Sequence, residues 1–164
     1  MVWSGFAIAL FLVFVFQTGV VSTLGLTQVD LFLVLALLCG MMAPLHDARL
    51  AAWFTGLGQD LGSADPLGIH AFVLGLTGVL LTQFRELGNI TVWWVRGLVA
   101  FLAAWPGQLL YRTFLRYWAG FGDETFPRMV AAASVTSAIA AALAMCITFL
   151  PYYSRRRQRL YSSY

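Results

Sequence analysis

Long apolar runs separated by short polar breaks dominate the hydrophobic pattern of this chain. The first charged residue is Asp30, so residues 3–24 form one apolar stretch free of charges. A helix needs roughly 20 such residues to cross about 30 Å of bilayer hydrocarbon. No basic segment precedes this stretch, which is longer than the apolar part of a secretory signal. We therefore expect a membrane-spanning helix over residues 3–24.

Five further apolar runs follow, and they differ in length. Residues 31–45 and 50–61 would make helices of only about 22 Å and 18 Å, which is short for a straight crossing. These two runs are either short spans that thin the bilayer locally or a re-entrant pair. The remaining runs cover residues 66–84, 91–117 and 129–150, and Pro106 predicts a kink in the second of them.

This pattern predicts an all-α membrane protein with about six transmembrane helices, some of them short or kinked. The length allows one domain. We expect residues 1–151 to form a single polytopic membrane domain and residues 152–164 to form a basic cytoplasmic tail.

The polar breaks carry signals for helix ends. Asp65 followed by Pro66 predicts an N-cap and the first residue of a helix. Pro44 and the segment 46–49, which contains His46, Asp47 and Arg49, are expected to separate the two short helices. The last run is rich in alanine, serine and threonine, which let membrane helices approach closely, so we expect it to pack centrally.

The composition agrees with a membrane protein. Hydrophobic residues make up 60% of the chain and charged residues only 10%, and the mean hydropathy is +0.80. A soluble domain usually has about a quarter of its residues charged. All ten basic residues are arginine, and four of them, at 155, 156, 157 and 159, account for the net charge of +3. We expect this run to anchor the topology and attract anionic membrane lipids, not nucleic acid.

The arginines also predict the orientation. Six spans, or four spans with a re-entrant pair, place both termini on the same side. Arginine-rich connections face the cytoplasm. The side of the termini would hold Arg49, Arg85, Arg96 and the four tail arginines, and the other side Arg112, Arg116 and Arg128. Both termini are therefore expected to be cytoplasmic.

Candidate catalytic and metal-binding residues are sparse. Cys39 and Cys146 each lie inside an apolar run, where a thiol usually serves as a small packing residue. His46 and His70 lack partners at metal-ligand spacing, and no nucleophile–base–carboxylate pattern or phosphate-binding loop is present. We expect His70 to be a satisfied polar residue in the first turns of the fourth helix. We expect no enzyme activity, no cofactor and no metal.

The densest polar cluster inside an apolar region is at residues 56–62 and contains Gln59 and Asp60. An ionisable residue within a membrane segment is by default a candidate for function. We expect Asp60 to lie near the interface within reach of water. Gln59 and Asp60 either bond backbone groups of the turn, contact a partner, or bind a ligand or ion.

Residues 56–70, GLGQDLGSADPLGIH, resemble the signature stretch of the MreD family of bacterial rod shape-determining membrane proteins. In that family a Gly-Leu pair is followed by an Asp and then by a turn of small residues that leads into Pro-Leu-Gly. The pattern falls on Gly56, Leu57, Asp60, Leu61, Pro66, Leu67 and Gly68. Gly58 and Gly62 stand where the family commonly has bulkier apolar residues, and the second half of the chain carries no matching motif.

The resemblance implies a non-catalytic scaffold in the bacterial cytoplasmic (inner) membrane. MreD-like proteins resemble the substrate-binding subunits of energy-coupling-factor transporters in fold. They act in peptidoglycan synthesis and cell-wall elongation with MreC and with a RodA-type glycosyltransferase and its class B transpeptidase. Gly56, Gln59, Asp60, Pro66 and Gly68 would then shape a surface for a partner helix.

Two other functions stay open. A vitamin-like solute could bind if the chain were a subunit of a membrane transporter, because short broken helices are typical of transporter sites. A lipid-modifying enzyme could use Arg96, Arg112 and Arg116 to hold a phosphate group. Arg112 and Arg116 lie on one helix face, however, and are expected to extend toward the outer interface.

Overall fold

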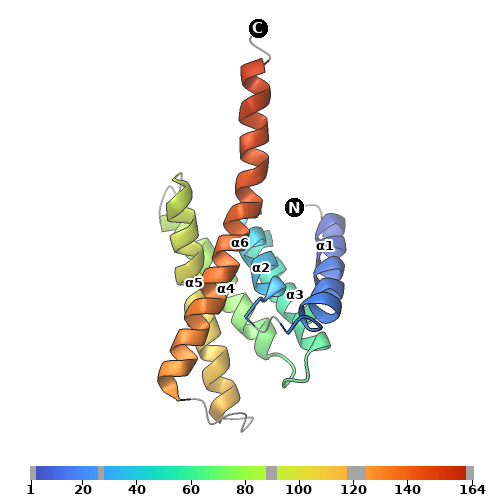
Figure 1. Cartoon of the computed structure of the whole chain (residues 1–164), viewed down its shortest axis with the longest axis vertical. Coiled ribbons are helices and arrows are strands. Elements are labelled where there is room, and N and C mark those ends of the chain that lie inside the picture. The colour runs from blue at the N-terminus through green and yellow to red at the C-terminus, as the bar shows by residue number, and fades with distance from the viewer. Residues whose placement is uncertain (1–2, 26–27, 88–91, 118–124, 162–164) are drawn as a thin grey trace.

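The computed structural model describes residues 3–25, 28–87, 92–117 and 125–161, with residues 150–161 described as helical backbone only. Within these ranges the chain folds into six α-helices and one short π-helix, with no β-strand, as the sequence predicted. The elements, shown in Figure 1, are α1 (Trp3–Phe16), the π-helix η1 (Gln17–Val21), α2 (Leu31–Met42), α3 (Leu45–Gly62), α4 (Ile69–Leu87), α5 (Trp93–Tyr117) and α6 (Phe126–Tyr161).

The helix at the centre of the bundle is α2. Residues 32–37 are all buried, and α2 contacts α1, α3, α4, α5 and α6. Small side chains on the neighbouring helices let them approach it closely, namely Ala52, Ala100, Ala103, Ala104, Ala140, Ala141 and Ala144. The expectation that the last helix would be central is therefore wrong. Helix α6 packs its small residues against α5 and α2 and exposes Val135, Leu143 and Ile147.

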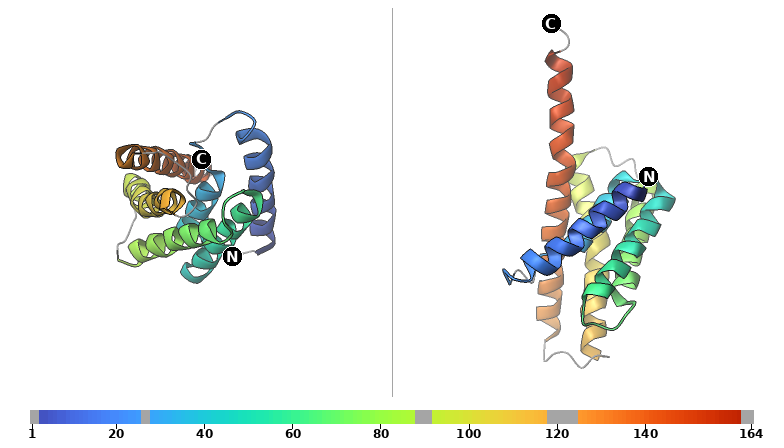
Figure 2. Two further views of the ribbon diagram at one scale, coloured as in Figure 1. Left: turned by 90° about the horizontal axis from the view of Figure 1, so that it is seen from below. Right: turned by 90° about the vertical axis from the view of Figure 1, so that its right-hand side faces the viewer.

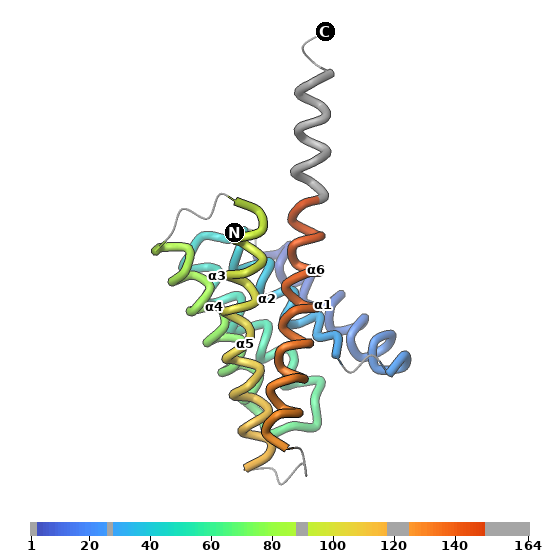
Figure 3. The backbone as a smooth tube through the Cα atoms, turned by 60° about the vertical axis from the view of Figure 1, so that its left-hand side comes forward, coloured from blue at the N-terminus to red at the C-terminus, as the bar shows by residue number. Residues whose placement is uncertain are grey.

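Helix α1 lies at the edge of the bundle. It is tilted against the bundle (Figure 2) and packs on α2 and α3. Figure 3 shows α4 and α5 on one side of α6 and α1 on the other. The Gln17 side chain of η1 donates to the carbonyl of Val29 and accepts the N–H of Leu31, at 3.1 and 3.0 Å. These bonds tie the end of the first apolar stretch to the start of α2.

Arginines hold together the end of the bundle where α2 ends, α3 begins and α4 ends. Arg85 donates to the carbonyl oxygens of Gly40 and Ala43, the latter at 2.9 Å, and so satisfies the C-terminus of α2. Arg49 donates to Thr82 at 2.8 Å and to Glu86 at 3.1 Å. Arg49, Arg85 and Glu86, which the sequence pattern placed in polar connections, therefore lie inside helices. They connect α2, α3 and α4.

Several helix boundaries differ from those predicted. Pro44 separates α2 from α3, as expected, but residues 46–49 form the first turns of α3 and not a loop. Pro106 lies inside α5. Helix α6 continues to Tyr161, so the predicted boundary between domain and tail at residues 151 and 152 lies within a helix.

Two helical stretches of the described chain are long and apolar enough to cross a membrane by length and composition, Trp3–Val21 and Phe126–Phe149. Helix α2 is apolar but has only 12 residues, or about 18 Å. Helices α3, α4 and α5 have 18, 19 and 25 residues but contain more polar and charged positions.

Candidate functional site

The candidate site lies where the end of α3 meets the start of α4. At Gly56 the backbone of α4 comes so close that a Cβ atom would collide with the backbone of His70 and Ala71. At Gly78 a Cβ atom would lie 2.5 Å from the Cβ of Ala52. Glycine alone permits such an approach. The two helices are thereby held close enough for side chains of α3 to reach the N-terminus of α4.

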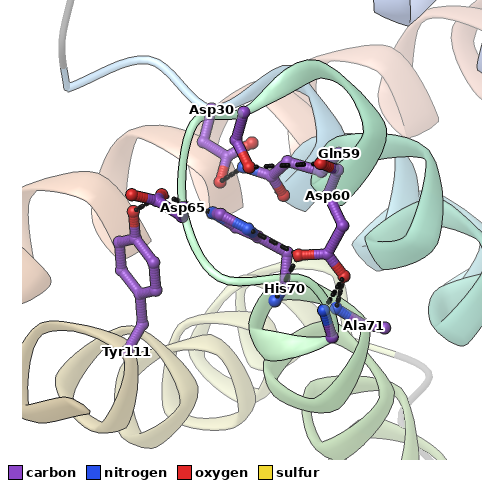
Figure 4. Close-up of polar contacts among 9 residues, drawn as sticks. Asp30, Gln59, Asp60, Asp65, His70, Ala71 and Tyr111 are labelled. Atoms are coloured by element: carbon purple, nitrogen blue, oxygen red, sulfur yellow. Dashed lines mark hydrogen bonds and ion pairs between the residues drawn. The ribbon is translucent and has the colours of Figure 1, made fainter. Parts of the chain in front are cut away.

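Asp60, in the last turn of α3, caps the N-terminus of α4 (Figure 4). Its Oδ2 atom accepts the N–H groups of Gly68 and Ala71 at 3.0 and 3.1 Å. Its Oδ1 atom accepts the backbone N–H and Nδ1 of His70, both at 3.0 Å. The first N–H groups of a helix have no intrahelical acceptor and carry partial positive charge, so a carboxylate is favourable there.

Two expectations about Asp60 can now be compared with its surroundings. The side chain is only 1% exposed, so the expectation that water reaches it is wrong. The expectation that it bonds backbone groups of the turn is confirmed. Burying a carboxylate is unfavourable unless its oxygens are paired, and these donors provide the pairing.

Gln59 connects α3 to the start of α2. Its Nε2 atom donates to Oδ2 of Asp30 at 3.3 Å, while Oδ1 of Asp30 accepts the N–H of Leu33 and caps α2. The Oε1 atom of Gln59 is buried and has no hydrogen-bond partner among the described residues. Asp30 lies in the connection between α1 and α2, and its burial raises the pKa of the carboxyl above the usual value, against hydrogen bonds from Leu33 and Gln59 that lower it.

Asp65 does not cap α4, which begins at Ile69 and not at Pro66 as predicted. Its Oδ2 atom accepts the hydroxyl of Tyr111 on α5 at 2.7 Å and lies 3.6 Å from Nε2 of His70. The ring centroids of His70 and Tyr111 are 4.8 Å apart. Asp65 thus connects the loop between α3 and α4 to α5.

The remaining predicted residues, Pro66 and Gly68, lie in that loop. Pro66 is exposed and contributes no side chain to the cluster. Gly68 has φ = +97°, a conformation that other residues rarely adopt, and this geometry turns its N–H toward Asp60. The structure therefore brings Gln59, Asp60 and Gly68 together, places Gly56 one turn away, and leaves Pro66 at the surface.

Sequence reasoning missed Asp30, Asp65 and Tyr111 as members of the cluster and gave His70 only a satisfied polar role. His70 is satisfied through Asp60, as expected, but it also faces Asp65. One signal was available in the sequence, because four of these residues lie near the predicted ends of apolar runs, namely Asp30, Asp60, Asp65 and His70. Short helices could place all four at the same end of a bundle. Tyr111 gave no such signal.

One apolar groove lies near this part of the bundle, and a second lies at the opposite end of the bundle. The larger, of about 360 Å³, lies between α4 and α5 and is lined by Leu67, Gly68, Ile69, Phe72, Val73, Leu110 and Phe114. The smaller, of about 260 Å³, lies at the C-terminal end of α2 and is lined by Leu38, Cys39, Met42, Ala43 and Pro44.

The geometry of the cluster allows capping, bridging and proton binding. In the described part of the chain, no group of three or more His, Cys, Asp or Glu side chains could hold a metal ion. Comparison of the chain with models of protein families, with curated proteins and with solved structures finds no match. The resemblance to the MreD family therefore stays a prediction from residues 56–70.

Proposed function

We propose that this chain is a polytopic protein of the bacterial cytoplasmic membrane, with about six helices crossing the bilayer and both termini in the cytoplasm. Large apolar side chains are exposed on α1, α3, α4, α5 and α6, for example Phe11, Trp53, Phe72, Leu102 and Ile147. Water-soluble monomers rarely expose so much contiguous apolar surface, whereas lipid tails accommodate it. Helices α2, α3, α4 and α5 cross together with the two that meet the criteria of length and apolarity.

In this proposal the chain is an MreD-like, non-catalytic scaffold of the rod-shape and cell-wall elongation complex. It binds MreC and supports a RodA-type glycosyltransferase and its class B transpeptidase. The resemblance of residues 56–70 supplies the identity of these partners, and the bundle supplies the exposed apolar helices that a partner helix would contact.

The bonding of Asp60 is the observation that favours a scaffold. Both carboxylate oxygens are occupied by N–H donors at the start of α4, and Gly56 and Gly68 permit that arrangement. The motif residues therefore fix the shape of their own chain. Residues with that role suit a protein that presents a surface, because a catalytic or ligand-binding carboxylate needs an oxygen that is open to the substrate.

A small-molecule-binding subunit of a membrane transporter is the second candidate, and the groove between α4 and α5 favours it. A vitamin-sized solute needs a few convergent polar groups in its pocket. The residues that line this groove are all apolar or glycine, and the polar side chains of Asp60 and Gln108 do not line it. The scaffold is therefore the better-supported function.

The test is affinity purification of the tagged chain from solubilised native membranes, followed by peptide identification of what is bound. A scaffold of the elongation complex recovers MreC together with the glycosyltransferase and transpeptidase. Recovery of a pair of ATPase subunits instead would support the transporter subunit.

Two variants make this purification quantitative. We expect Asp60→Ala to reduce the recovery of MreC by roughly tenfold, because the start of α4 loses its cap and the surface changes shape. The control is Asp123→Ala, which should recover as much MreC as the unaltered chain. The sequence pattern places Asp123 in the outer loop, and the residue lies outside the described ranges. Equal and negligible losses in both variants would contradict a role of residues 56–70 in assembly.

A further inference from the structure

The hydrogen-bonding roles of the His70 ring follow from its neighbours. Both oxygens of Asp60 accept backbone N–H groups, and Oδ1 lies 3.0 Å from Nδ1 of His70. A carboxylate oxygen accepts and does not donate, so Nδ1 must carry a hydrogen. In the neutral ring the lone pair is then on Nε2.

The Nε2 atom faces a second carboxylate. It lies 3.6 Å from Oδ2 of Asp65, which also accepts the hydroxyl of Tyr111 at 2.7 Å. With a neutral ring two acceptors face each other, which is unfavourable. One proton added to Nε2 gives an imidazolium N–H that faces a carboxylate, which is an ion pair.

We propose that His70 and Asp65 form a proton-operated latch. Binding of one proton at Nε2 fastens the loop of residues 63–68 to α4, and loss of the proton leaves Asp65 held by Tyr111 alone. The loop carries Leu67, which lines the groove between α4 and α5 beside Gly68, and the N–H of Gly68 stays bonded to Asp60 in either state. The latch thus fixes or frees Leu67 at the rim of that groove. This latch goes beyond the proposed function, and it would work in the same way in a scaffold and in a transporter subunit.

The groups that face His70 from each neighbouring element agree with this latch. Asp60 faces it from α3, Asp65 from the loop and Tyr111 from α5, while Asp30 at the start of α2 acts on it electrostatically. Arg112, next to Tyr111 on α5, acts electrostatically on the Tyr111 hydroxyl. The imidazole is 8% exposed, so a proton can exchange there while the ion pair is partly shielded from water.

The experiment measures how fast a cysteine in the loop reacts with a maleimide in the purified, detergent-solubilised protein. Leu67 is 78% exposed and is the reporter as Leu67→Cys, after Cys39 and Cys146 have been changed to alanine. Gln83→Cys, exposed on α4, corrects for the pH dependence of thiol reactivity. We expect the ratio of the two rates to rise roughly three- to tenfold between about pH 5.5 and pH 8.

Two further variants separate the latch from a general loosening of the protein. His70→Asn keeps a donor to Asp60 but cannot titrate or reach Asp65, so the ratio should be high at both pH values. Asp65→Asn keeps an acceptor for Tyr111 but loses the negative charge that attracts the imidazolium, so the ratio should change less than twofold between the two pH values. The latch is refuted if the loop with Asp65 and His70 intact shows less than a twofold change, or if either His70→Asn or Asp65→Asn keeps the full change.

Discussion

At the scale of single residues, Asp60 accepts more hydrogen bonds than any other described side chain in the cluster. Asp60→Asn keeps its size but leaves one accepting oxygen, and the new amide N–H₂ would face the N–H donors of Gly68 and Ala71. We expect a loss of about 2–4 kcal/mol in the free energy of unfolding. Denaturant unfolding in detergent micelles, followed by circular dichroism, measures this loss.

The matched control is Asp47→Asn, the same change in the first turns of the same helix. Its carboxylate is partly exposed and water can replace lost interactions, so we expect no measurable change in the free energy of unfolding. Equal losses at both positions would mean that the capping of α4 contributes no more than a surface carboxylate.

Asp30 gives a prediction about pH. Because burial raises the folded-state pKa of this carboxyl, its protonated form is favoured in the native protein. The stability that this group contributes is therefore fully present below about pH 4, which is the ordinary pKa of an aspartate in an unfolded chain. It is lost as the pH rises through the folded-state pKa. Asp30→Asn should remove this loss and keep the cap on Leu33, with the Gln59 amide turned over so that its Oε1 accepts the new N–H.

We expect Asp30→Asn to match the unaltered chain at low pH and to exceed it by about 1 kcal/mol at pH 8. Thermal unfolding at a series of pH values compares the two proteins. A variant that is less stable than the parent at pH 8 would show that the ionised carboxylate is needed there.

The residue-scale features that the sequence could predict were those set by local chemistry. Asp60 could be recognised as a turn residue because it stands between an apolar run and a series of small residues. Its donors could not be predicted, because they lie eight to eleven positions later and depend on the positive φ of Gly68. The role of Asp65 was misassigned because Asp-Pro is a strong local capping signal, whereas its real partner, Tyr111, comes from another helix.

At the scale of elements, the contact between α3 and α4 depends on glycine. Gly56→Ala places a Cβ atom against the α4 backbone, which cannot move aside as the end of a flexible side chain can. We expect a loss of about 1–3 kcal/mol in the free energy of unfolding. The measurement is the unfolding experiment used for Asp60.

Gly5→Ala in α1 is the control for this change, since a Cβ atom there meets nothing within 4 Å. In a helix interior, alanine is favoured over glycine by roughly 1 kcal/mol, so this variant should be as stable as the parent or more so. A Gly56→Ala protein that gained stability to the same extent would show that the two helices can move apart without loss.

The element boundaries show where local pattern is insufficient. His46, Asp47 and Arg49 are polar and follow a proline, which predicts a loop. Arg49 instead donates to Thr82 and Glu86 on α4 and lies within α3. The alanine-rich last helix had the composition of a central helix. Helix α2 is central instead, because its large side chains fit the small residues of three neighbours. These outcomes depend on tertiary partners, which a single sequence does not reveal.

At the scale of the whole molecule, the number of crossings decides how the chain sits in the bilayer. Single cysteines at exposed positions of the cysteine-free chain can report it, namely Thr23→Cys, His46→Cys, Ala64→Cys, Leu87→Cys and Phe126→Cys. They are treated with a membrane-impermeant maleimide in right-side-out and in inverted vesicles. With six spans and cytoplasmic termini, positions 23, 64 and 126 react from outside, and positions 46 and 87 react only in inverted vesicles.

The two other arrangements give different patterns at two positions. If only Trp3–Val21 and Phe126–Phe149 crossed, all five cysteines would react from outside, so Leu87→Cys separates two spans from six. If α2 and α3 were re-entrant, Leu87→Cys would still react in inverted vesicles, but position 46 would be shielded on both sides. The contact between Arg49 and Glu86 argues against the re-entrant arrangement, because it places the start of α3 beside the end of α4. We therefore expect positions 46 and 87 to react from the same, cytoplasmic side.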